Sequence, residues 1–226
     1  PGMKQLLLVL GSILAAYPAL GSGADAAPAA AAAPASSAAS PAAAAPAAAP
    51  KASKPAAPAT TYQVLVVTSL GNFTLELNAE RAPLTVANFL KYVDQGHYTN
   101  TIFHRVIANF VIQGGGFGTD DKPRAAPYKV VNESGNGLTN ERGTVGMARS
   151  QEPHSSDAQF YVNLYDNEAL DPSKTRWGYA VFGKVVSGMD VVDKIGNVPT
   201  GSHGPFKEDS PLKSVVIERI ERIPGP

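Results

Sequence analysis

Between Thr61 and Ile223 the apolar residues come in short runs of strand-forming type, and turn-forming residues end most of these runs. TYQVLVVTS at Thr61–Ser69 is rich in β-branched residues, and NFTLELN at Asn72–Asn78 alternates apolar and polar positions. Both patterns are typical of β-strands, and the Leu70-Gly71 pair between them predicts a hairpin. This part of the chain is therefore expected to form sheet rather than a bundle of helices.

Two segments favour helix. Pro83 to Gly96 places apolar residues at helical spacing between a proline start and a glycine stop, and MDVVDKIG at Met189–Gly196 is a shorter case. Many short strands with only two helices predict an all-β antiparallel barrel or sandwich. The further predicted strands lie at Ile102–Ile107 and Phe110–Gln113, within GTVGMA (143–148), QFYVNL (159–164) and GYAVFGKVV (178–186), and at Ser214–Ile223.

Two long stretches rich in Gly, Asn and Pro separate these elements, at Gly114–Gly143 and Asn197–Pro211. We interpret both as loops. Loops of this length in a compact domain are usually functional rather than passive connections.

The first 24 residues are predicted to be a secretory signal peptide, with Pro1 and Gly2 interpreted as a remnant ahead of Met3. Lys4 precedes an apolar run at Leu6–Ala16, and small residues follow it, as in exported proteins. The alternative is an uncleaved anchor, but a spanning helix needs about 20 apolar residues and this run is shorter. We expect export, cleavage near Ala24 or Ala26, and no stable membrane insertion afterwards.

Residues 25–60 are predicted to be a disordered linker, because alanine runs alternate with prolines throughout them. A proline every few residues removes helical hydrogen bonds and leaves no stretch long enough to nucleate a helix. The linker is either a tether that extends the reach of the domain or a passive spacer. The folded domain is expected to span residues 61–223.

Composition excludes several kinds of chemistry. The formal net charge is zero, which gives no sign of a nucleic-acid partner, and the absence of cysteine rules out disulfides and thiolate nucleophiles. The four histidines have no metal-ligand spacing, so neither a metal nor another cofactor is expected. GGGFG at Gly114–Gly118 lacks the residues of a phosphate loop, and Asp166 and Asp171 are interpreted as solvated loop residues.

Arg105 is the residue that these exclusions leave unexplained. It lies among Phe103, Val106 and Ile107, and no acidic residue except Asp94 occurs between Arg81 and Asp120. A guanidinium surrounded by apolar groups needs a partner. On a strand His104 would point to the opposite face, so we expect that histidine to be structural. The remaining pattern is a set of hydrogen-bond donors among apolar residues: Arg105, Gln113 and Gln159 with Phe110, Val111, Met147, Phe160, Tyr161, Leu170 and Tyr179.

Four motifs, in this order and spacing, resemble the cyclophilin-type peptidyl-prolyl cis-trans isomerases, and most closely their bacterial periplasmic members. The motifs are FHRVIANFVIQGG (103–115), GMARS (146–150), AQFYVN (158–163) and YAVFGKVVSGMDVV (179–192). The resemblance covers essentially Thr61 to Ile223. It implies a closed eight-stranded antiparallel barrel capped by two α-helices, an isomerase acting on Xaa-Pro bonds, and a periplasmic location.

The resemblance also implies roles for individual residues. Arg105 would be the catalytic arginine, and Gln113 would hold the substrate beside it. The other residues would line the proline pocket (Phe110, Val111, Tyr161, Leu170), border the groove for residues that precede proline (Ala148, Arg149, Gln159), or replace a common histidine (Tyr179). Arg149 is expected to act largely through its backbone.

Two positions depart from the family pattern. Tyr161 stands where phenylalanine is usual, so its hydroxyl at the pocket floor must find a partner. Ala169 stands where a tryptophan or phenylalanine is usual, and that tryptophan contacts cyclosporin in the family. We therefore expect weak cyclosporin binding here.

The expected partners are proline-containing polypeptides, bound by a protein that is a monomer. The alternative function is a binding or chaperone module that recognises proline peptides with little turnover. A third interpretation, in which Arg105 only braces the barrel, leaves Gln113 and the aromatic residues unexplained.

Overall fold

The computed structural model describes residues 61–224. The predicted signal peptide (1–24) and the predicted linker (25–60) lie outside these residues. Within the described part of the chain, no helix is both long and apolar enough to cross a membrane.

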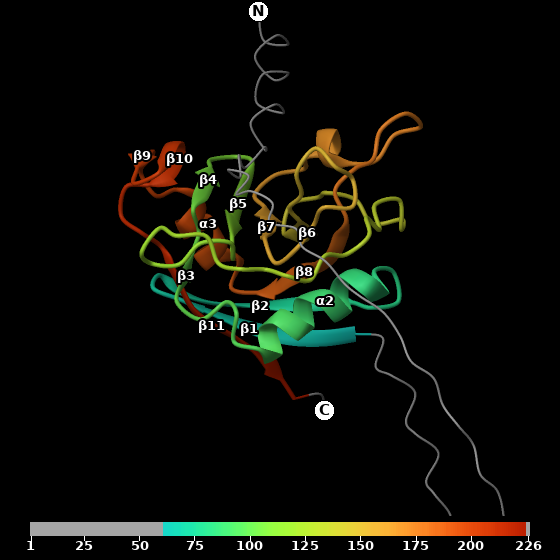
Figure 1. The fold of residues 1–226 in the computed structure, drawn as a ribbon, viewed down its shortest axis with the longest axis horizontal. Coiled ribbons are helices and arrows are strands. Elements are labelled where there is room, and N and C mark those ends of the chain that lie inside the picture. Colours follow the sequence, from blue (N-terminus) through green and yellow to red (C-terminus); the bar gives the residue numbers. More distant parts are fainter. Residues whose placement is uncertain (1–60, 225–226) are drawn as a thin grey trace, which may run out of the picture. The chain divides into compact units, whose positions relative to one another are not determined.

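The fold is built on one curled, antiparallel nine-stranded sheet (Figure 1), in the order β3-β11-β1-β2-β8-β6-β7-β5-β4. The predicted hairpin of β1 and β2 is confirmed, and it pairs Thr61 with Asn78 and Thr68 with Gly71. The strands are β1 (Thr61–Thr68), β2 (Gly71–Asn78), β3 (Thr101–Ile102), β4 (Arg105–Ile107), β5 (Val111–Gly114), β6 (Thr144–Met147), β7 (Phe160–Asn163), β8 (Val181–Ser187) and β11 (Val216–Ile223).

The strand count and the closure differ from the expected closed, eight-stranded barrel. The single strand predicted at Ile102–Ile107 is divided into β3 and β4, which form the two edges of the sheet and do not pair with each other. Between them, the Phe103 backbone N–H donates to the Val215 carbonyl at 2.9 Å, and Phe103 and His104 are buried. The chain therefore bends from one edge to the other, and the hydrogen-bond ladder stays open at that point.

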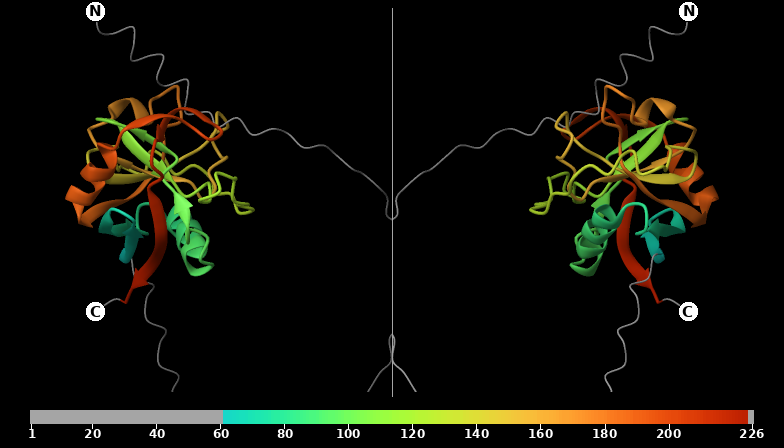
Figure 2. Two further views of the ribbon diagram at one scale, coloured as in Figure 1. Left: turned by 90° about the vertical axis from the view of Figure 1, so that its left-hand side faces the viewer. Right: turned by 90° about the vertical axis from the view of Figure 1, so that its right-hand side faces the viewer.

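Both predicted helices are confirmed. Helix α2 (Pro83–Asp94) begins with proline at its first turn, and Gly96 follows its end with a left-handed φ of 66°. Helix α3 spans Met189–Gly196. Figure 2 shows α2 (green) beside β11 (red), and its buried Phe89 contacts the rings of Phe160 and Phe182 from the sheet. These aromatic contacts tie α2 to the hydrophobic core.

The prediction of a loop at Asn197–Pro211 is wrong, because this stretch contains a second, two-stranded sheet. Strand β9 (Thr200–His203) pairs with β10 (Phe206–Pro211). Its polar, Gly- and Pro-containing sequence hides the hairpin, since few of its residues are buried and no apolar alternation results. Figure 1 shows β9 and β10 close to β4, and β10 packs against β4.

Candidate active site

Four neighbouring strands place a row of residues across one face of the sheet. Arg105 on β4 lies opposite Gln113 on β5, Gln113 lies opposite Tyr161 on β7, and Tyr161 lies opposite Gly146 on β6. Directly opposed residues of antiparallel strands project to the same face. Arg105, Gln113 and Tyr161 are therefore brought together by the strand register, although 56 positions separate the first from the last.

This row borders a small pocket of about 240 Å³, including its open mouth. Four of its residues, Val111, Ala148, Tyr161 and Leu170, form an apolar cluster separate from the main core, and Phe110 and Tyr179 pack against them. Eight of the ten residues expected at the site line the pocket: Arg105, Phe110, Val111, Gln113, Ala148, Tyr161, Leu170 and Tyr179. The pocket thus combines an apolar wall with a guanidinium and a carboxamide.

The other two expected residues, Arg149 and Gln159, do not line this pocket but contact residues that do. Gln113 Nε2 donates to Gln159 Oε1 at 3.2 Å, so Gln159 fixes the orientation of the Gln113 amide. The Arg149 guanidinium donates to the Trp177 and Ser150 carbonyls at 2.9 Å each, and it lies 4.5 Å from the centre of the Tyr179 ring. Its side chain braces the pocket wall.

Arg105 is largely buried, with 12% of its side chain exposed. Its Nη1 makes no hydrogen bond to any of the described residues. Burial lowers the pKa of Arg105, and the negative charges of Asp209 and Glu208 oppose that shift. Arginine starts from so high a pKa that the group remains charged near neutral pH.

Arg105 has an acidic partner in the protein, outside the stretch from Arg81 to Asp120 in which the sequence offers only Asp94. Asp209 on β10 places Oδ2 3.7 Å from Arg105 Nε. That separation is an ion pair rather than a direct hydrogen bond. The carboxylate was missed because it lies 104 positions further along the chain, in a stretch predicted as loop.

The Tyr161 hydroxyl has the partner that its position requires. It donates to Asn140 Oδ1 at 2.6 Å, and Asn163 Nδ2 donates to the same oxygen at 3.2 Å. Asp171 Oδ1 accepts from the Asn140 backbone and side-chain amides at 2.8 Å each, so the interpretation of Asp171 as merely solvated is wrong. Sequence reasoning missed Asn140 and Asn163, because their role appears only in the hydrogen bonds that join Tyr161 to Asn140 and Asn140 to Asn163.

Gly146 leaves space for the Tyr161 ring. A Cβ at Gly146 would overlap the Tyr161 hydroxyl oxygen and the ring carbon that carries it. Gly146 belongs to the GMARS motif, but the motif alone does not identify it as a site residue. Its signal is the absence of a side chain directly opposite an aromatic residue in a neighbouring strand.

The rim residues are held through their backbones. Asn109, with a left-handed φ of 59°, turns the chain between β4 and β5, and the Phe110 carbonyl then accepts from the Leu164 N–H at 2.8 Å.

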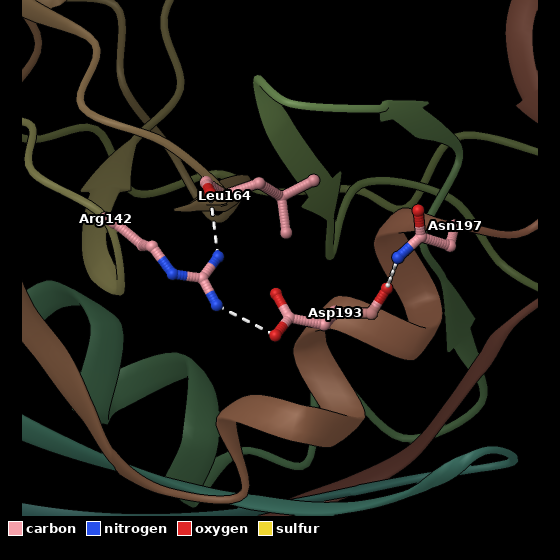
Figure 3. A network of polar contacts seen from close by, with 4 residues as sticks. All are labelled: Arg142, Leu164, Asp193 and Asn197. Atoms are coloured by element: carbon pink, nitrogen blue, oxygen red, sulfur yellow. Dashed lines mark hydrogen bonds and ion pairs between the residues drawn. The ribbon is translucent and has the colours of Figure 1, made fainter.

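Arg142 links Leu164 to helix α3. It donates to the Leu164 carbonyl and to Asp193 Oδ2 at 2.8 Å each (Figure 3). Asp166 is exposed in a loop, as expected, and its Oδ1 also accepts from the Arg142 N–H at 2.8 Å.

His104 takes no part in the pocket lining. Its buried ring packs against Phe117 and Phe206, with centroids 4.6 and 5.7 Å away. Burial lowers the pKa of His104 to about 3, so the ring is neutral near pH 7. The expectation that this histidine is structural agrees with that packing. Among the described residues, no three His, Asp or Glu side chains cluster as a metal site would require.

Comparison with known proteins identifies the family. Residues 63–222 match the family described as "Cyclophilin type peptidyl-prolyl cis-trans isomerase/CLD". The chain belongs to the cyclophilin-type isomerases. Peptidyl-prolyl cis-trans isomerase A of Dickeya dadantii is 48% identical over 167 residues, which cover 74% of this chain and 87% of the relative. Peptidyl-prolyl cis-trans isomerase B of Escherichia coli is 49% identical over 156 residues, which cover 68% of this chain and 94% of the relative.

A solved cyclophilin has the same fold. The crystal structure of a Cryptosporidium parvum cyclophilin-type isomerase superposes with a TM-score of 0.63 at 28% identity, covering 74% of this chain and 99% of that one. The domain thus has an all-β cyclophilin fold with two helices and has peptidyl-prolyl cis-trans isomerase activity.

Proposed function

We propose that this cyclophilin accelerates rotation about Xaa-Pro bonds by stabilising the twisted imide with Arg105. The observation that carries the proposal is the cross-strand row of Arg105 and Gln113 beside a pocket with an apolar wall. Arg105 Nη1 is buried and has no hydrogen-bond partner among the described residues, which leaves a charged donor for a bound substrate.

The chemistry follows from the nature of the bond. An Xaa-Pro bond rotates slowly because its C–N bond has partial double-bond character, and twisting it gives the proline nitrogen a true lone pair. A donor directed at that nitrogen binds the transition state better than the planar ground state. One charge-assisted hydrogen bond of about 1.5–3 kcal/mol gives roughly 10- to 150-fold acceleration.

The other pocket residues would supply positioning. Phe110, Val111, Tyr161 and Leu170 would hold the proline ring while the preceding carbonyl rotates, and Gln113 would steady that carbonyl. Exclusion of water from the pocket would further favour the twisted form, because water stabilises the planar amide. No step transfers a proton, and no metal or other cofactor is needed.

The proposed substrates are proline-containing polypeptides in the periplasm, where the enzyme would act as a monomer and assist the folding of exported proteins. One support is the signal-like segment at the start of the chain. Another is a structure of the C. parvum isomerase "in the presence of dipeptide ala-pro", with a TM-score of 0.62 and 28% identity, which covers 72% of this chain and 99% of that one. With Ala169 in place of the aromatic residue that is usual in the family, cyclosporin is proposed to bind weakly.

The test is the pH profile of kcat/KM for wild type and Arg105→Ala on one Xaa-Pro peptide. The profile of the wild type should be flat from pH 6 to 9, because arginine does not titrate there and the pKa of His104 is lowered to about 3. Arg105→Ala should lose at least about tenfold in kcat/KM. A bell-shaped profile around a histidine pKa, or an Arg105→Ala variant with unchanged turnover, would contradict the mechanism.

A binding or chaperone module with little turnover is the alternative. It would show affinity for proline peptides without an increase in exchange rate. Binding isotherms measured beside turnover on the same peptide separate the two functions. The buried, unpartnered Nη1 favours catalysis, since a pure binding protein gains little from a donor directed at a twisted nitrogen.

A further inference from the structure

Strand β10 carries an irregularity next to the proposed catalytic arginine. Phe206 pairs with His203 and Ser210 pairs with Gly201, so the register of β9 and β10 shifts between Phe206 and Ser210. Such bulges redirect side chains and are frequent beside active sites. Asp209 lies within the irregular segment.

The backbone of Asp209 has a conformation that residues other than Gly, Asn and Asp rarely adopt. Its φ is 58°, in the left-handed region. A strained backbone conformation of this kind persists only where the surrounding structure holds it, and such conformations cluster at functional sites. Here the carboxylate reaches Arg105, with Oδ2 3.7 Å from Nε.

The ion pair engages one edge of the guanidinium. The carboxylate is close to Nε, whereas Nη1 is buried without a hydrogen-bond partner in the described part of the chain. A guanidinium is planar and rigid, so a charge fixed beside Nε also restricts the direction of the two Nη groups. Without that charge, the buried Arg105 guanidinium would lower its free energy by turning towards water.

We propose that Asp209 is a positioning residue, which holds the Arg105 guanidinium in the direction that serves the twisted imide. This inference rests on the proposed function of Arg105. It adds a residue from β10, outside the strands that line the pocket, and gives the bulged hairpin a role in catalysis.

The test compares Asp209→Asn with Glu208→Gln, each assayed for kcat and KM on one Xaa-Pro peptide. Asparagine removes the charge and still tolerates the left-handed backbone. Glu208 is an exposed acid on the same strand, and its charge also acts on Arg105 although no ion pair joins the two among the described residues, so it controls for loss of nearby negative charge without loss of the contact. We expect Asp209→Asn to lower kcat about 3- to 10-fold with KM within twofold, and Glu208→Gln to stay within 1.5-fold of wild type.

Asp209→Gly is the second variant, because glycine adopts the same φ without strain and also lacks the carboxylate. It should show the same loss of kcat. In an Arg105→Ala background, Asp209→Asn should cause no further loss, which a purely structural role would not predict. Wild-type kcat for Asp209→Asn, a rise in kcat, or an equal loss in Glu208→Gln would overturn the inference. Equal turnover of wild type and Arg105→Ala would instead overturn the proposed function.

Discussion

At the scale of single residues, the pocket depends on polar side chains that are each held by a second residue. Gln113 is oriented by Gln159, Tyr161 by Asn140, and the Arg149 guanidinium by backbone carbonyls. The first member of each pair could be identified from sequence, because it belongs to a motif. Asn140, and Asp209 as the partner of Arg105, could not, since they lie in stretches without a pattern, 21 and 104 positions from the residues they contact.

The Tyr161 hydroxyl offers a prediction at this scale. Tyr161→Phe removes the bond to Asn140 Oδ1, which keeps the Asn163 donor, so the free energy of unfolding should fall by about 1 kcal/mol. The ring stays in place, and kcat/KM should remain within twofold. Urea unfolding and an isomerase assay measure both. Tyr165→Phe is the matched control, because Tyr165 is 61% exposed, and it should change neither quantity. A loss of stability as large in the control would contradict the role of Asn140.

At the scale of elements, most strands and both helices can be predicted from local sequence patterns, whereas the edge strands of the main sheet and the second sheet cannot. The β1–β2 hairpin and both helices are predictable from periodicity, proline starts and glycine stops. The division of β3 from β4 and the β9–β10 hairpin are not, because both depend on packing against distant segments. His104 shows this dependence, since it lies between β3 and β4 and packs on Phe206 of β10.

Strand β6 gives a prediction through Gly146. Gly146→Ala would place a methyl group on the Tyr161 hydroxyl and force the ring from the pocket floor. Overpacking of this kind lowers the free energy of unfolding by about 1–3 kcal/mol. We expect kcat/KM to fall together with stability, as measured by isomerase assay and urea unfolding. Wild-type values for both would show that Tyr161 is not confined by β6.

The junction of β3 and β4 gives a prediction on pH. The pKa of His104 is lowered to about 3, against an ordinary value of 6.5, so the unfolded chain binds this proton first as the pH falls. Stability is therefore lost progressively below about pH 6.5, and the loss from this group between pH 7 and 4.5 should be about 2–3 kcal/mol. His104→Gln should flatten this part of the pH dependence in urea unfolding. If the free energy of unfolding of His104→Gln depended on pH as steeply as that of the wild type, the burial of a neutral His104 ring would be contradicted.

At the scale of the whole molecule, every residue of the pocket comes from the span between Arg105 and Tyr179. The membership of the family could be predicted from four motifs in that span and its flanks, because the motifs specify the site and the strands that carry it. The closure of the sheet could not, since it depends on where two edge strands meet.

The start of the chain carries the prediction on export. If the signal peptide is cleaved, the N-terminus of the protein recovered from the periplasm should lie near Ala24 or Ala26, because small residues follow the apolar run there. N-terminal sequencing measures this directly. An intact N-terminus in a membrane fraction would instead support the uncleaved anchor.

The most direct test of the central claim is the exchange rate of a peptide while it is bound. NMR exchange spectroscopy of a saturating Ala-Pro peptide gives this rate for wild type and for Arg105→Ala, and the same titration gives the affinity. If Arg105 acts on the transition state, the variant should bind within about threefold of wild type, and its bound-state exchange should be slower by at least about tenfold. Equal bound-state exchange rates in the two proteins would contradict the account.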